Sequence, residues 1–201
     1  MSAAKKASAA VPTTDKPPIE RELKFAQVDL DALRSRLLEV EAERLGPAIF
    51  EENWLVDRNG ELGDRMSILR VRAEEGRGAV VTFKGPASFD GSTKVRTELE
   101  LRVENAEKAL ALLTALGYSV ERRYQKLREE WRLGTETICL DHTPIGDFVE
   151  FEGDRAEAVA KRCGFDQAKA LRKSYLMLYA EYLASHPEAP FDMVFADDDS
   201  K

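Results

Sequence analysis

The strongest constraint on how this chain can fold is an alternation of apolar and charged side chains with a period of two. In residues 94–103 the odd positions are Val, Thr, Leu, Leu and Val, whereas the even positions are Lys, Arg, Glu, Glu and Arg. Successive side chains of a β-strand point to opposite faces, so this alternation predicts strands with one apolar and one charged face. The strands are expected at residues 19–25, 50–57, 65–72, 79–84, 94–103, 122–132, 136–141 and 147–152.

Turn and helix signals between these strands predict an α+β fold, in which helices are attached to an antiparallel meander. Asn59-Gly60 is a favoured hairpin sequence and separates the second expected strand from the third. Four other segments repeat apolar residues with a helical period. These segments are residues 30–40, residues 105–116, residues 155–163, and the stretch after Asp166 that aligns Leu171, Tyr175, Leu178 and Tyr182.

The folded domain is expected to span residues 19–184, between two tails. Residues 1–18 are rich in Ala, Ser, Thr, Lys and Pro, which is typical of a disordered leader. Residues 185–201 contain two prolines and three successive aspartates, which predict a flexible acidic tail. Three apolar residues of this tail are candidates for docking on the domain: Phe191, Met193 and Phe195.

The net charge of −7 argues against general binding to nucleic acid or to an anionic membrane. The only two cysteines, Cys139 and Cys163, are too few for a disulfide framework or a zinc ligand set, and they suit a reducing cytoplasm. No apolar run reaches the length of a transmembrane helix, and the first residues lack the apolar core of a signal peptide. We therefore expect a cytoplasmic protein whose oligomeric state is open, a homodimer included.

Nearly every expected strand has one face that carries almost only Arg, Lys and Glu. For a single strand, the simplest interpretation is a solvent-exposed face with cross-strand ion pairs. A solvent-exposed face usually also contains Ser, Thr, Asn and Gln, which are scarce here. If the sheet closes with its apolar face outward, the charged face lines a tunnel. Because clustered charges are costly away from bulk water, such a lining predicts a polyanion with bound cations.

Adjacent phosphates need several cationic donors, and the Arg guanidinium matches phosphate oxygens in a bidentate way. The basic candidates on the charged faces are Lys24, Arg70, Arg72, Lys84, Arg96, Lys126 and Arg128. Mg²⁺ or Mn²⁺ prefers carboxylate oxygens and shares phosphate oxygens of a substrate. Three Glu-x-Glu pairs provide such oxygens, namely Glu20 and Glu22, Glu98 and Glu100, and Glu150 and Glu152.

These motifs together resemble the CYTH family, the triphosphate tunnel metalloenzymes that include class IV adenylate cyclases and thiamine triphosphatases. The resemblance covers about residues 19–183, and its motifs follow the order of the family. The motifs are Glu20-x-Glu22-x-Lys24, Leu69-Arg70-x-Arg72, Lys84-Gly85-Pro86, Arg96-x-Glu98-x-Glu100, Lys126-x-Arg128, Leu140-Asp141, residues 146–152 and Lys173-Ser174-Tyr175. One departure is Trp54, on a strand that is often Tyr-rich in the family and that here still ends in Asp57.

The resemblance implies a closed antiparallel barrel of about eight strands, with helices outside and a triphosphate inside. It implies metal binding by the six glutamates, with Asp141 in a supporting or metal role. It also adds Lys173 to the phosphate-binding residues and makes Lys24 a candidate for helping to activate the nucleophile.

Three functions follow as alternatives. The first is a metal-dependent triphosphatase acting on tripolyphosphate, thiamine triphosphate or another organic triphosphate. The second is an adenylate cyclase that converts ATP to cyclic AMP and pyrophosphate. The third is a polyphosphate- or nucleotide-binding module without turnover. We favour the hydrolase because the sequence shows no clear adenine-reading motif, and we rank the module last because all three acidic pairs are intact.

Overall fold

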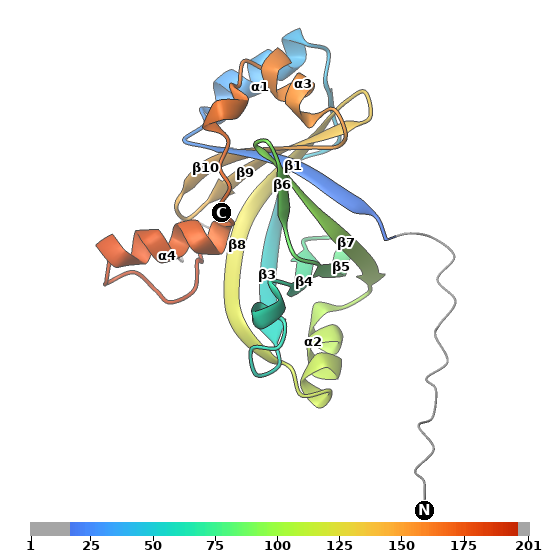
Figure 1. The fold of residues 1–201 in the computed structure, drawn as a ribbon, viewed down its shortest axis with the longest axis vertical. Coiled ribbons are helices and arrows are strands. Elements are labelled where there is room, and N and C mark those ends of the chain that lie inside the picture. Colours follow the sequence, from blue (N-terminus) through green and yellow to red (C-terminus); the bar gives the residue numbers. More distant parts are fainter. Residues whose placement is uncertain (1–16, 197–201) are drawn as a thin grey trace, which may run out of the picture.

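A computed structural model describes residues 17–196, and a closed antiparallel barrel of eight strands forms its centre (Figure 1). Around the barrel the strands follow the order β1, β10, β9, β8, β3, β4, β5 and β7, and β7 pairs with β1 to close the ring. These strands are β1 (Ile19–Ala26), β3 (Ile49–Asp57), β4 (Ile68–Glu74), β5 (Gly78–Lys84), β7 (Thr93–Val103), β8 (Ser119–Leu133), β9 (Glu136–Thr143) and β10 (Gly146–Glu152). The predicted eight-stranded barrel is confirmed.

Two short strands extend the sheet beyond the ring. Strand β2 (Glu43–Arg44) pairs with β8, and β6 (Ser88–Asp90) pairs with β7. The predicted leader lies mostly outside the described residues, and so do the last five residues of the predicted tail.

Four helices lie outside the barrel, as predicted (Figure 1). They are α1 (Leu30–Glu39), α2 (Ala106–Ala115), α3 (Ala156–Arg162) and α4 (Tyr175–Ser185). The side chain of Asp29 caps α1 by accepting hydrogen bonds from two backbone N–H groups of its first turn. Within residues 17–196, no helix is both long and apolar enough to cross a membrane.

The main core lies between the outer face of the barrel and the helices α1 and α3. Leu23 of β1, Leu37 of α1, Phe151 of β10 and Ala160 of α3 belong to one cluster, and each is at most 1% exposed. Because β1 alternates, the same strand turns its charged residues to the inside of the barrel. The outer face of β7 is not covered in the same way, since Leu101 is 64% exposed.

The fourth helix begins later than its apolar period predicts. The Asp166 side chain caps only a short 3₁₀ helix, η2 (Gln167–Lys169), after which the chain is extended. The backbone N–H of Leu171 donates a hydrogen bond of 2.7 Å to the carbonyl oxygen of Lys24. Helix α4 then begins after Ser174, whose side chain accepts from the N–H of Met177. Leu171 therefore packs from an extended segment that lies along β1.

The segment after α4 docks on β8 up to the end of the described residues. Met193 is fully buried, and its backbone donates to the carbonyl oxygen of Arg123 and accepts from the N–H of Gln125. The hydroxyl of Tyr179 donates to the carbonyl oxygens of Pro190 and Asp192. Residues 187–196 of the expected tail are thus held by backbone hydrogen bonds. Strand β8 pairs with β9 only from Leu127 onward, so this segment covers an edge that β9 leaves open.

The burial of α1 predicts a contrast between two adjacent leucines. We expect Leu37→Ala to lower the free energy of unfolding by about 2–5 kcal/mol, because Leu37 is fully buried and the change leaves a cavity. Leu38→Ala is the matched control, with an expected change within about 0.5 kcal/mol, because Leu38 is 65% exposed. Denaturant unfolding followed by circular dichroism measures both. Equal losses in the two variants would contradict this placement of the core.

Candidate functional site

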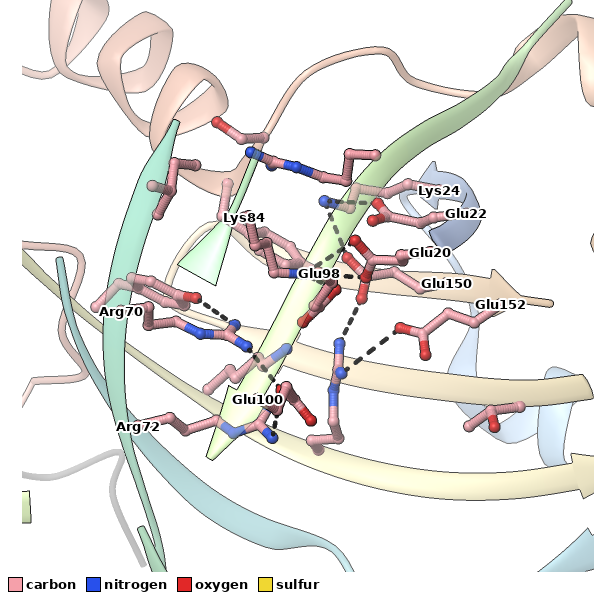
Figure 2. Close-up of a pocket in the computed structure, with 18 of the residues that line it drawn as sticks. Glu20, Glu22, Lys24, Arg70, Arg72, Lys84, Glu98, Glu100, Glu150 and Glu152 are labelled. Atoms are coloured by element: carbon pink, nitrogen blue, oxygen red, sulfur yellow. Dashed lines mark hydrogen bonds and ion pairs between the residues drawn. The ribbon is translucent and has the colours of Figure 1, made fainter. Parts of the chain in front are cut away.

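A cavity of about 390 Å³ runs into the barrel, and charged side chains form most of its wall. The residues that line it come mostly from the inward-facing positions of all eight barrel strands and from the start of α4. Figure 2 shows the side chains of both charge signs converging on this space from the surrounding strands. The charged strand faces predicted from the period of two therefore become the lining of a tunnel-like cavity.

Seven of the eight predicted phosphate-binding residues line the cavity. They are Lys24, Arg70, Arg72, Lys84, Arg96, Lys126 and Arg128. Lys126 and Lys24 are almost fully buried, at 2% and 4% exposure. The Arg96 guanidinium is partly engaged by the protein, since its Nε and Nη2 donate to the carbonyl oxygen of Gly85 at 2.9 and 2.5 Å.

Lys173 does not join this group. Its ammonium lies 2.5 Å from a carboxylate oxygen of Glu181 on the surface of α4, and its side chain is 43% exposed. The residues next to it in the sequence, Ser174 and Tyr175, do line the cavity. The chain turns from an extended segment into α4 at this point, so Lys173 faces away from the side that Tyr175 presents to the barrel.

All six glutamates predicted as metal ligands line the cavity: Glu20, Glu22, Glu98, Glu100, Glu150 and Glu152. Each of them lies within 4 Å of a Lys or Arg side chain. Within residues 17–196, no group of three or more acidic, His or Cys side chains is arranged to hold a metal ion. The glutamates are thus collected around one space but are paired with cations of the protein itself.

Lys84 is held between two of these glutamates. Its Nζ lies 2.9 Å and 3.0 Å from the two carboxylate oxygens of Glu20 and 2.8 Å from Glu98 (Figure 2). Burial would raise the pKa of Glu20, but Lys84 outweighs burial and lowers it to about 2. Burial and the nearby Glu20 carboxylate raise the pKa of Glu98 to about 7, although Lys84 opposes them. The two carboxylates therefore already form a site for one cation.

A second ion-pair network centres on Asp141 and Glu150. The Arg128 guanidinium donates to both carboxylate oxygens of Asp141, at 2.7 and 2.6 Å, and also binds Glu150. Lys126 lies 3.0 Å from Asp141, and Lys24 lies 2.9 Å from Glu150. Asp141 is fully buried and does not line the cavity. Asp141 thus lies on the inner face of β9, directly opposite Arg128, where it supports two cationic residues of the wall.

Two tyrosines complete the wall, although the sequence analysis assigned them no role in the site. The Tyr124 hydroxyl accepts a hydrogen bond of 3.2 Å from Arg70. The Tyr175 hydroxyl donates to Asp141 at 2.6 Å, and its ring centre lies 4.0 Å from the Lys24 ammonium. The sequence does contain a signal for Tyr124. Its position is even, like that of Lys126, which places both side chains on the charged face of the same strand.

The sequence and the fold match known proteins. A family model described as the CYTH domain matches residues 18–178. A protein of Methanocaldococcus jannaschii, provisionally named an adenylate cyclase, is 28% identical over 123 residues, which are 55% of this chain and 69% of that protein.

Two solved structures illustrate the similarity of fold. A Vibrio parahaemolyticus protein, also provisionally named an adenylate cyclase, gives a TM-score of 0.73 at 22% identity and covers 82% of this chain and 99% of its own. A Hippeastrum protein, described as a provisionally named adenylyl cyclase with a dominant triphosphatase activity, gives a TM-score of 0.64 at 15% identity. That match covers 81% of this chain and 96% of the Hippeastrum chain. At these identities the two structures support the fold alone.

The environment of Glu152 predicts a dependence of stability on pH. Burial and the carboxylates of Glu150, Glu20 and Glu22 raise its pKa to about 8, against the opposing charge of Arg128. The folded protein therefore holds a proton that the unfolded chain releases near pH 4.5, and metal-free stability falls as the pH rises toward 8.

We expect Glu152→Gln to remove this loss of stability at high pH, because the glutamine side chain does not ionise. The variant should unfold at nearly the same temperature as the wild type at pH 5 and at a higher temperature at pH 8–9. Thermal unfolding in the presence of a chelator measures the difference, and Glu104→Gln, at an exposed position, is the control. An advantage of Glu152→Gln that did not grow with pH would contradict the assignment.

The surface position of Lys173 leads to a further prediction. We expect Lys173→Ala to change the affinity for a triphosphate by no more than about twofold, because its ion pair with Glu181 is solvent-exposed. Lys84→Ala is the comparison, and the loss of a cation whose side chain is only 14% exposed in the wall should weaken binding at least about tenfold. Calorimetric titration with tripolyphosphate measures both variants. A large loss in Lys173→Ala would restore Lys173 to the binding residues.

Proposed function

This chain belongs to the CYTH domain family, and on that premise we propose that it is a divalent-metal-dependent triphosphatase. In the proposed reaction, water attacks the terminal phosphorus of an inorganic or organic triphosphate, the bond from that phosphorus to the bridging oxygen breaks, and the remaining diphosphate leaves, so that the products are orthophosphate and that diphosphate. The observation that carries the proposal is the convergence of seven cationic side chains and six glutamates inside one closed barrel.

The cationic side chains match a chain of phosphates better than they match the carboxylates with which they pair in the ligand-free protein. Arg70 and Arg72 follow one another on the inner face of β4, and both lie within 4 Å of a carboxylate oxygen of Glu100 (Figure 2). Bidentate contacts from such guanidinium groups to phosphate oxygens are short and strong. A triphosphate in the cavity would replace these long ion pairs with closer ones. Phosphoryl transfer depends mostly on such positioning and charge neutralisation, and it needs no covalent nucleophile.

The acidic residues suit a hard divalent cation. The CYTH family is metal-dependent in general, and the six glutamates offer only oxygen donors, which Mg²⁺ and Mn²⁺ prefer. Glu20 and Glu98 already enclose one cation, the ammonium of Lys84, which supports their capacity to hold another positive charge. Glu20, Glu22, Glu98, Glu100, Glu150 and Glu152 are the proposed ligands. When bound, such an ion neutralises charge on the phosphates and polarises their oxygens.

In the metal-free protein, Lys24 is best suited to provide a positive charge and to donate hydrogen bonds. Burial lowers its pKa, but the carboxylates of Glu150 and Glu22 outweigh burial and raise the pKa above its usual range. The ammonium therefore keeps its proton and cannot act as a base in this arrangement. A role of Lys24 in activating the nucleophile stays a prediction, and it requires that a bound ligand first draw away those two carboxylates.

Adenylate cyclase is the second candidate, and one observation favours it. Three aliphatic side chains line the otherwise charged cavity, namely Leu55 of β3, Ile68 of β4 and Leu176 of α4. They offer apolar surface to the base or sugar of a nucleotide. Members of the CYTH family are adenylate cyclases or triphosphatases, and the Methanocaldococcus jannaschii relative bears the cyclase name. The Hippeastrum protein, with its triphosphatase activity, supports the hydrolase.

Phosphorus NMR of the products separates these candidates. The purified protein is incubated with tripolyphosphate, thiamine triphosphate or ATP, each with Mg²⁺ or Mn²⁺. We expect orthophosphate to appear from at least one triphosphate, as a hydrolase requires. Pyrophosphate together with cyclic AMP from ATP would make the protein a cyclase instead. Unchanged spectra for all three compounds would leave a binding module without turnover.

A double variant tests the acidic half of the site. We expect Glu150→Gln combined with Glu152→Gln to lower turnover about a hundredfold or more while the fold survives, since carboxylate donors are lost. Glu104→Gln combined with Glu107→Gln, at exposed positions, is the matched control and should retain full activity. If the protein were only a binding module, the first variant would bind tripolyphosphate as well as or better than the wild type.

A further inference from the structure

One wall of the cavity concentrates unpaired polar atoms. Within residues 17–196, the buried side-chain nitrogen and oxygen atoms without a hydrogen-bond partner belong to four residues: Glu51, Asn53, Arg70 and Arg72. The atoms are Oε2 of Glu51, Oδ1 and Nδ2 of Asn53, and the Nε atoms of the two arginines. Buried polar groups are nearly always paired in folded proteins, so a cluster of unpaired ones requires an explanation.

The four residues are neighbours on the inner face of two paired strands. Asn53 of β3 lies directly opposite Arg72 of β4 and, on its other side, opposite Tyr124 of β8. Residues directly opposite in an antiparallel pair have Cβ atoms about 4.5–5.5 Å apart. Asn53 shares the parity of Leu55, which lines the cavity, so its amide points inward between Arg72 and Tyr124.

The arrangement of the two arginines explains why their Nε atoms are free. Arg72 uses its Nη2 to bind Glu74 at 2.9 Å, and Arg70 uses its Nη1 to bind the Tyr124 hydroxyl at 3.2 Å. Figure 2 shows the two guanidinium groups near each other, and both lie within 4 Å of the same carboxylate oxygen of Glu100. The ends of both groups are thus turned to residues of the protein in the ligand-free state.

The unpaired atoms form complementary donors and acceptors. The Nε–H of Arg72 is a donor, and Oδ1 of Asn53, opposite it, is an acceptor. The Nδ2 of Asn53 is a donor, and Oε2 of Glu51, two residues away on the same strand face, is an acceptor. A rotation of the Arg72 side chain that brings its Nε–H to Oδ1 of Asn53 would therefore satisfy both of these atoms. An apolar residue at position 53 would avoid the cost of burying an unpaired amide in the ligand-free state. It would, however, offer no acceptor to the Nε–H of Arg72.

We propose that Asn53 is a positioning residue for triphosphate binding, which orients the Arg72 guanidinium toward the phosphates by accepting its Nε–H. The inference rests on the proposed function, because a bound triphosphate is what draws Arg72 away from Glu74 and Glu100. A guanidinium fixed through Nε presents its two terminal nitrogens in the plane that bidentate phosphate binding needs. Asn53 acts through Arg72 and touches no reacting atom.

The test uses Asn53→Leu, which keeps the number and branching of the side-chain heavy atoms, in the full chain. The free variant should unfold about 2–4 °C higher than the wild type, because an unpaired buried amide is replaced by an apolar group. Its affinity for a methylene-bridged tripolyphosphate analogue, measured by calorimetry with Mg²⁺, should fall about tenfold. Neither a hydrolase nor a cyclase cleaves this analogue, so binding is measured without turnover. A purely structural role would move stability and affinity in the same direction or leave affinity unchanged.

Arg72→Lys provides the matched background, because lysine keeps the positive charge but has no Nε–H to donate. In that background Asn53→Leu should cost no further affinity. An equal loss in both backgrounds, or no loss in either, would overturn the inference. If Asn53→Leu fails to fold, Asn53→Ala is measured in its place with the same expectation for affinity. A wild-type protein that did not bind the analogue would overturn the proposed function itself.

Discussion

The buried carboxylate of Asp141 connects the parts of the molecule on which the site depends. It lies on β9 and binds Arg128 and Lys126 of the neighbouring strand β8, and it also accepts from the hydroxyl of Tyr175 on α4. Burying an ion is costly unless it is paired and its remaining lone pairs are satisfied, and here three donors satisfy it. Loss of this one carboxylate would leave Arg128 with Glu150 and Lys126 with Glu51 as their nearest remaining counter-charges. The position of α4 and the direction of two cationic side chains therefore depend on a residue that the cavity does not expose.

The ligand-free barrel is held together by ion pairs that a ligand would have to break. Lys84 binds Glu20 and Glu98, and Lys24 binds Glu150, at distances below 3.0 Å. Such pairs offset the cost of placing many charges inside a protein, yet a better-matched partner for either sign can displace them. A phosphate chain with its cations supplies both partners together. The same lining can thus be stable when free and still bind a highly charged ligand, because binding exchanges one set of neutralising contacts for another.

The strand period and the motifs in the sequence were enough to predict the eight-stranded barrel and the set of charges that face its interior. This was possible because inward and outward positions alternate strictly, so that parity assigns a face to each residue. Parity does not show what a side chain binds. Lys173 lies on the surface because the chain turns into α4 next to it, and Asp141 is fully buried beneath the side chains that bind it, so neither residue lines the cavity. The sequence pattern does not identify Asn53, because its significance depends on a missing hydrogen-bond partner, which only packing can show.

The segment that follows α4 has a consequence for how this barrel behaves in concentrated solution. The matched family region ends at residue 178, inside α4, yet the hydrogen bonds of Met193 cover part of β8 next to the point where β9 ends. An uncovered strand edge offers free N–H and C=O groups to any other extended chain, and such pairing leads to aggregation. A chain shortened to the family boundary would expose this edge together with the buried side chain of Met193's neighbour Tyr124. By covering this strand edge, residues 187–196 therefore also disfavour the association of one barrel with another.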